Sequence, residues 1–107
     1  MNNTNQQLFS KLVSQIQNEI FANKKKKGFN ITNVPLEFCL VSGELAEAFD
    51  AWKKKKDDLG EELADVFIYL LGLSSILKID LGKEILNKLE KNEKREYYID
   101  KGVLLKK

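Results

Sequence analysis

The sequence predicts an all-α protein, a four-helix bundle built as a single domain over residues 1–107. Long stretches contain no helix breaker, because the chain has one proline and six scattered glycines. Four segments repeat apolar residues at helical spacing, and the connections between them are short. Hydrophobic residues make up 43% of the chain and charged residues 32%, a balance that indicates a globular domain rather than a disordered segment.

Apolar residues repeat at helical spacing through about residues 4–23, which predicts the first helix. Thr4 is its candidate N-cap. The four lysines at 24–27 are interpreted as a frayed C-terminus before Gly28, since cations favour that end of a helix and glycine commonly follows it.

The second helix is expected at about residues 34–53, with Asn33 as the N-cap and Pro35 in the first turn. This segment is apolar on most of its sides, more than one partner helix would cover. The turn that follows places Lys53–Lys56 at the end of one helix and Asp57-Asp58 at the start of the next, as both helix dipoles favour.

The third helix is expected at about residues 58–78, and Asp80 is the N-cap of a fourth helix at about 81–96. The charged tail 97–107 is too short to assign. Helices two and three carry more apolar surface than their neighbours can cover, so we expect a homo-oligomer, either a dimer or a tetramer.

Two acidic pairs lie within apolar runs, Glu44 with Glu47 and Glu62 with Asp65. Each pair is spaced i, i+3, so its two carboxylates project from one face of a helix. Acidic residues are seldom fully buried unless they are paired or bound to a metal. Four converging carboxylates would therefore need a divalent cation. The alternative is that each pair lies on a solvated stripe and the two helices do not face one another.

The chain contains no histidine, which restricts the chemistry of any site. Nucleophilic sites of the Ser–His or Cys–His kind are excluded, and so are zinc sites with histidine ligands. Oxygen ligands alone remain for a metal, and they suit Mg²⁺ or Mn²⁺.

Acidic residues gather in the centre of the chain, between basic ends. This distribution suits a metal site beside a phosphate-binding rim, and it makes nucleic acid an improbable partner. No apolar run approaches the length of a membrane span, so no membrane partner is expected. The single Cys39 lies in an apolar run, which favours a buried thiol in a reducing, cytoplasmic environment.

The segments GELAEAFDAW, EELADVFIYL, IDLGKEIL and KLEKNEKREYY together resemble the MazG-like all-α nucleoside triphosphate pyrophosphohydrolases, in particular the dCTP pyrophosphatase branch. The resemblance covers about residues 29–97. It implies the all-α fold of that family and hydrolysis of a nucleoside triphosphate, for example a dCTP-like or modified one, to the monophosphate and pyrophosphate. It also implies Mg²⁺ held by an ExxE and an ExxD motif, and a role in cleaning the nucleotide pool.

The resemblance assigns the functional residues by motif. The metal ligands fall on four acidic residues: Glu44, Glu47, Glu62 and Asp65. The catalytic carboxylate that accepts a proton from the attacking water is then Glu44 or Glu47. The substrate contacts fall on five residues, aromatic ones for the base and polar ones for phosphate and sugar: Trp52, Tyr69, Lys88, Asn92 and Arg95.

Two other classes of function stay open at this point. One is a non-catalytic helical oligomer that binds a nucleotide or a protein partner. The presence of all four acidic residues argues against this class. The other is a basic nucleic-acid-binding helical module, which the acidic centre disfavours. Steep salt-dependent DNA binding that is insensitive to EDTA would favour that second class.

Overall fold

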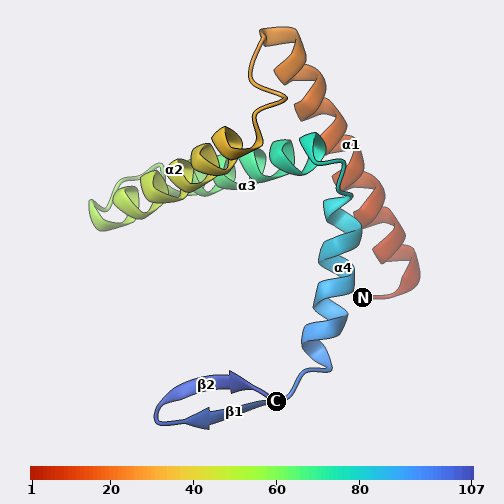
Figure 1. Ribbon diagram of the computed structural model, residues 1–107, viewed down its shortest axis with the longest axis vertical. Coiled ribbons are helices and arrows are strands. Elements are labelled where there is room, and N and C mark those ends of the chain that lie inside the picture. Colours follow the sequence, from red (N-terminus) through yellow and green to blue (C-terminus); the bar gives the residue numbers. More distant parts are fainter.

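The computed structural model describes all 107 residues and consists mainly of four helices packed together, which confirms the predicted all-α class. The helices are α1 (Asn3–Lys27), α2 (Val34–Lys53), α3 (Leu59–Ile76) and α4 (Leu81–Glu93). A short hairpin of β1 (Tyr97–Asp100) and β2 (Val103–Lys106) follows them. Figure 1 shows α2 beside α3 and α4 beside α1, and α1 also contacts α3.

The four helices form two packed pairs that point in different directions from the α1–α3 contact (Figure 1). The radius of gyration is 16.8 Å, whereas a compact domain of this length would have about 13 Å. Only ten of the 107 residues are buried. The chain by itself is therefore an open structure with a small core.

The start of α1 differs from the prediction. Asn2, rather than Thr4, is the N-cap, and its side-chain oxygen accepts a 2.8 Å hydrogen bond from the backbone N–H of Asn5. Asn is as good a cap as Thr, and it stands two residues earlier, so Thr4 is drawn into the first turn of the helix.

The end of α1 also differs, because the helix includes the four lysines and continues to Lys27 instead of ending near residue 23. Gly28 ends it in the left-handed conformation at φ 72°, which glycine adopts without steric cost. The N–H groups of Gly28 and Phe29 donate to the last-turn carbonyls of Lys25 and Lys24. Cations in the last turn stabilise the negative end of a helix dipole, so the lysine run extends the helix rather than fraying it.

Two other caps confirm the predictions. The side chain of Asn33 accepts from the N–H of Leu36, and that of Asp80 accepts from the N–H of Lys83. The third helix is slightly shorter at both ends than expected, at Leu59–Ile76. The fourth ends at residue 93 instead of 96, because the chain becomes extended to enter the β-hairpin.

The C-terminal tail, which the sequence analysis left unassigned, forms an antiparallel hairpin. Tyr97 pairs with Lys106 and Asp100 with Val103. The two residues between the strands, Lys101 and Gly102, both have positive φ, at 51° and 78°. Positive φ at both central positions is the conformation that two-residue hairpin turns favour.

Gln17 of α1 fixes how the two pairs of helices meet. The side chain is 5% exposed. Its Nε2 donates to the carbonyl of Ile79 at 2.9 Å, and its Oε1 accepts from the N–H of Leu81 at 3.2 Å. Its backbone carbonyl accepts from the hydroxyl of Ser75 at 3.1 Å. One buried amide therefore joins α1 to the end of α3 and the start of α4.

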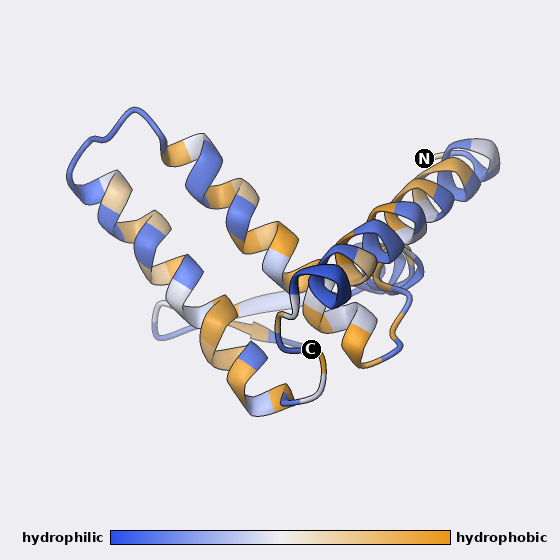
Figure 2. Cartoon of the chain, turned by 90° about the horizontal axis from the view of Figure 1, so that it is seen from above, coloured by the Kyte–Doolittle hydropathy of each residue, from blue (hydrophilic) through white to orange (hydrophobic).

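Large apolar side chains on α2 and α3 remain exposed, and Figure 2 shows hydrophobic residues spread along the arms of the structure. Trp52 is 62% exposed, and Leu45 and Phe49 are each 57% exposed. Cys39 is exposed as well, which corrects the expectation of a buried thiol: it lies on an α2 side that no other helix of the chain covers. None of the helices combines the length and the apolarity that crossing a membrane requires.

We predict that the chain associates in solution through this uncovered apolar surface of α2 and α3. Exposed apolar patches of this extent drive association because their burial removes them from water. Multi-angle light scattering at micromolar concentration should give at least twice the 12.3 kDa of one chain. A mass of one chain would contradict the prediction.

Candidate metal centre

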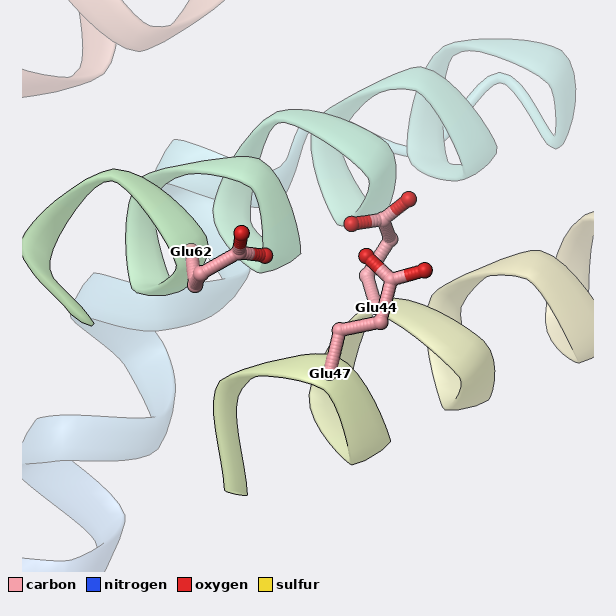
Figure 3. Close-up of side chains that lie close together, drawn as sticks. All are labelled: Glu44, Glu47 and Glu62. Atoms are coloured by element: carbon pink, nitrogen blue, oxygen red, sulfur yellow. The ribbon is translucent and has the colours of Figure 1, made fainter. Parts of the chain in front are cut away.

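The α2–α3 hairpin brings three carboxylates together. Glu44 and Glu47 extend from α2, Glu62 extends from α3, and their carboxylate groups approach one another (Figure 3). One oxygen atom from each lies within 4.8 Å of one from the other two. The two helices thus face one another at their acidic positions, and the alternative of separate solvated stripes does not hold for these three residues.

Small buried side chains on α2 lie next to this carboxylate cluster, by which we mean Glu44, Glu47 and Glu62. Ala48 and Ala51 are each only 2% exposed. They belong to the helix that packs against α3, and a methyl side chain keeps two helix backbones close. The alternation of acids with alanines in GELAEAFDAW therefore gives α2 both a packing surface and a row of carboxylates.

Asp65, the fourth predicted ligand, is exposed and stands outside the cluster of three. It follows Glu62 by three residues on the same helix face. Its negative charge is among the causes that raise the pKa of Glu44 and of Glu62. Asp65 thus lies at the edge of the cluster, near enough to act on two of its members.

The cluster is electrostatically unfavourable without a cation. Partial burial, followed by the charges of Glu47, Asp65 and Glu62, raises the pKa of Glu44. Partial burial, followed by the charges of Asp58, Glu47 and Asp65, raises the pKa of Glu62.

Glu62 also has an unsatisfied atom, because its Oε2 is buried and has no hydrogen-bond partner. A buried carboxylate oxygen without a donor is unfavourable and calls for an explanation, and a bound ion supplies one. Carboxylate oxygens are the ligands that Mg²⁺ and Mn²⁺ prefer. The residues present therefore fit a hard divalent cation.

Beside the cluster lies an open pocket of about 450 Å³ that is lined by Glu47, Asp50, Lys56 and Glu62 among others. Lys56 is the one cation among these four, and its charge partly opposes the rise in the pKa of Glu62. A phosphate chain that approached the cluster from this side would meet both an ammonium group and the carboxylates.

Tyr69 lies half-buried on α3, one turn after Asp65. Burial raises the pKa of its hydroxyl, and the charges of Glu44, Asp65, Glu37 and Glu47 raise it further. The tyrosine therefore lies within the field of the cluster, on the side away from the α2–α3 turn.

Trp52 lies on the opposite side of the cluster, near the α2–α3 turn. Its ring stacks on that of Phe49, with centroids 6.0 Å apart and an interplanar angle of 17°. Trp52 follows Glu47 by five residues toward the α2–α3 turn, and Tyr69 follows Asp65 by four residues away from that turn.

The remaining predicted contacts, Lys88, Asn92 and Arg95, lie on α4 and its C-terminal end. Since α4 packs along α1, they are apart from the carboxylate cluster within one chain (Figure 1). The nearby charge of Arg95, then burial and the charges of Lys106 and Lys91, lower the pKa of Lys88. These residues thus belong to a basic cluster at the end of α4 and on the hairpin.

The sequence analysis missed one buried charge pair. Glu37 of α2 is completely buried, and its Oε1 accepts hydrogen bonds from Lys24 Nζ at 2.9 Å and from Asn30 Nδ2 at 3.1 Å. Its other oxygen, Oε2, has no partner. An acid inside the apolar run LEFCL could have drawn attention to Glu37, but nothing distinguishes Lys24 from the other three lysines of its run.

Comparison with known proteins now identifies the family. The sequence profile of the MazG nucleotide pyrophosphohydrolase domain matches residues 38–99. The chain belongs to this family. Its members are typically metal-dependent, in agreement with the cluster of glutamates that the MazG-matched segment contains.

Three curated relatives match the chain over part of its length. The dCTP pyrophosphatase 1 of Rattus norvegicus is 38% identical over 64 residues, which cover 50% of this chain and 38% of the relative. The protein of that name from Mus musculus gives the same values, and the one from Bos taurus is 36% identical over 64 residues. The matched region spans only 38% of the length of these relatives. No solved structure matches the chain.

We predict that Glu47→Gln abolishes hydrolysis of a nucleoside triphosphate by the chain. The change should also remove the effect of Mg²⁺ on stability while leaving the fold intact. In metal-free buffer the variant should melt at the same temperature as the parent or higher, because one repulsive charge is gone. With Mg²⁺ the parent should gain melting temperature and the variant should not. Glu61→Gln, an exposed change outside the cluster, is the matched control and should behave like the parent. If the melting temperature of the parent does not rise with Mg²⁺, the idea of a cation site shared by these carboxylates is contradicted.

A second prediction concerns pH. Because the pKa values of Glu44 and Glu62 are raised above the ordinary 4.5, the folded chain keeps protons that the unfolded chain has already released. Proton binding by Glu44 and Glu62 therefore stabilises the folded chain at low pH. In EDTA, the contribution of these two groups to the free energy of unfolding should fall as the pH rises from about 4.5 through the raised pKa values. Mg²⁺ binds the deprotonated groups, so its stabilising effect should increase over the same interval.

The measurement is a series of melting curves from about pH 4.5 to neutrality, for the parent and for Glu44→Gln, in EDTA and in Mg²⁺. The difference between the two proteins in EDTA isolates the contribution of Glu44. A difference that is independent of pH over this interval would be inconsistent with the raised pKa.

Proposed function

We propose that the chain is a Mg²⁺-dependent nucleoside triphosphate pyrophosphohydrolase that converts its substrate to the monophosphate and pyrophosphate. One observation carries the proposal: three carboxylates from two helices converge within 4.8 Å in a chain of the MazG family. The buried Oε2 of Glu62 without a partner supports it, since a cation would satisfy that atom.

The proposed division of labour follows from the positions of the acids. Glu44, Glu47 and Glu62, with Asp65 at the edge, would hold the cation, which when bound neutralises charge on the phosphate oxygens. Glu44 or Glu47 would accept a proton from the attacking water, as a carboxylate that the cation does not fully engage. The water oxygen then forms a bond to the α-phosphorus, and the bond to the pyrophosphate leaving group breaks.

The base would extend from the phosphates toward Tyr69, which lies one turn beyond Asp65. We propose a dCTP-like or modified pyrimidine triphosphate as the substrate. The partial similarity to dCTP pyrophosphatase 1 proteins supports this choice. A role in removing such nucleotides from the cellular pool follows from the reaction.

A homo-oligomer completes the proposed site. Lys88, Asn92 and Arg95 are separated from the cluster in one chain, because α4 lies along α1. A second copy that covers the apolar surface of α2 and α3 would bring another set of basic side chains toward the phosphates. Lys88 would act there as a point charge, and Arg95 as a planar donor.

The proposal is tested by incubating the purified chain with common and modified nucleoside triphosphates in Mg²⁺ and separating the products by chromatography. Monophosphate and pyrophosphate should appear in equal amounts, and both EDTA and Glu62→Gln should prevent their formation. Release of orthophosphate instead, or nucleotide binding without turnover, would contradict the proposed reaction. The latter result would favour a non-catalytic nucleotide-binding oligomer.

We further predict that Tyr69→Ala raises KM for the preferred nucleotide by roughly tenfold. Stacking of a base on an aromatic side chain is worth about 1–3 kcal/mol, and tenfold corresponds to about 1.4 kcal/mol. Tyr69→Phe keeps the ring and should stay close to the parent. Hydrolysis of a base-free ribose triphosphate should hardly change. Equal losses on both substrates would show that Tyr69 serves packing and not base recognition.

A further inference from the structure

A small cavity lies beside Tyr69, between α1 and α3. Its volume is about 150 Å³, and six of the residues that line it are Ile20, Asn23, Lys24, Phe29, Tyr69 and Gly72. A protein cavity of about 150 Å³ can hold one benzene ring. The cavity therefore matches a single six-membered ring, and Tyr69 connects it to the carboxylate cluster.

Lys24 is the one cation in the wall of this cavity. Its side chain is only 12% exposed, and its Nζ donates to Glu37 Oε1 at 2.9 Å. An ammonium group has three N–H donors, so this bond leaves two for a ligand. Asn30 donates to the same glutamate oxygen at 3.1 Å, which holds the carboxylate in place behind the lysine.

The Lys24–Glu37 pair is poorly explained as a device for stability. Removing two charges from water carries a penalty that their attraction often fails to recover, and apolar replacements of buried pairs are frequently as stable. Here the penalty is greater, because Glu37 Oε2 is buried without a partner. The pair does hold the ammonium group of Lys24 in a fixed position at the wall of a cavity that has room for a single six-membered ring.

We propose that Lys24 determines base specificity: its ammonium group, positioned by Glu37, donates a hydrogen bond to a carbonyl oxygen of a pyrimidine base bound in this cavity. The inference rests on the proposed function. Pyrimidine bases carry a carbonyl oxygen next to a ring nitrogen. Adenine, by contrast, has no carbonyl oxygen, and it has two fused rings instead of one. Lys24 and Glu37 both lie outside the family-matched residues 38–99, so the family match itself does not account for this contact.

The test compares dCTP and dUTP with dATP and a base-free ribose triphosphate as substrates, using the double variant Lys24→Met with Glu37→Gln. Lys24→Met alone would leave a buried charge without a partner and could unfold the chain. The double variant removes both charges, and its glutamine still accepts from Asn30. Lys26→Met, an exposed change in the same lysine run, is the matched control. Melting curves establish that all variants are folded.

The double variant should raise KM for dCTP and dUTP about tenfold, leave kcat nearly unchanged, and reduce the preference over dATP by the same factor. The base-free triphosphate should be hydrolysed as by the parent, and Lys26→Met should match the parent throughout. An unchanged preference, or equal losses on all substrates including the base-free one, would overturn the role of Lys24 while leaving the pyrophosphohydrolase proposal standing. A parent that hydrolyses none of the triphosphates would instead refute the proposed function, and the inference with it.

Discussion

Repulsion between carboxylates that two helices force together is the constraint on which the rest of this structure depends. Glu44 and Glu47 occupy the α2 side and Glu62 the α3 side of one helical hairpin, and small buried alanines on α2 accompany the acids. The raised pKa values of Glu44 and Glu62 and the unsatisfied Oε2 of Glu62 are consequences of that packing. A hard divalent cation is the natural counterion, and in the proposed function it would make the same arrangement a site for phosphate chemistry.

The open shape of the chain leaves two features of a single copy unsatisfied, its apolar surface and the distance between its basic residues and its carboxylates. The α2–α3 hairpin projects away from α1 and α4 and leaves large apolar side chains uncovered. The basic residues at the end of α4 are likewise distant from the carboxylates of the same chain. Association of two or more copies would address both features, since it would bury the apolar surface and supply cations near the phosphates. Assembly and catalysis are therefore linked in the proposed function.

The helices, two of their N-caps and the acidic faces could be predicted from the sequence, because each depends on residues close together in the chain. Periodicity gave four helices, Asn33 and Asp80 marked their starts, and i, i+3 spacing placed the acids on common faces. What could not be predicted depends on long-range packing. The partner of Lys24 lies thirteen residues away on another helix, and an apolar run could not reveal that Cys39 stays exposed. The C-terminal hairpin was left unassigned because the tail is short and charged, and its turn has Lys-Gly in place of the commoner Asn-Gly.

The central claim, a single cation shared between α2 and α3, is tested most directly by titrating Mn²⁺ into the metal-free chain and following free Mn²⁺ by electron paramagnetic resonance. The parent should bind Mn²⁺, and Mg²⁺ should compete for the same site. Glu47→Gln on α2 and Glu62→Gln on α3 should each abolish most of the binding, and the double variant should lose little more, because the ligands act as one unit. Losses that are independent and additive, or binding that survives either change, would contradict a shared site.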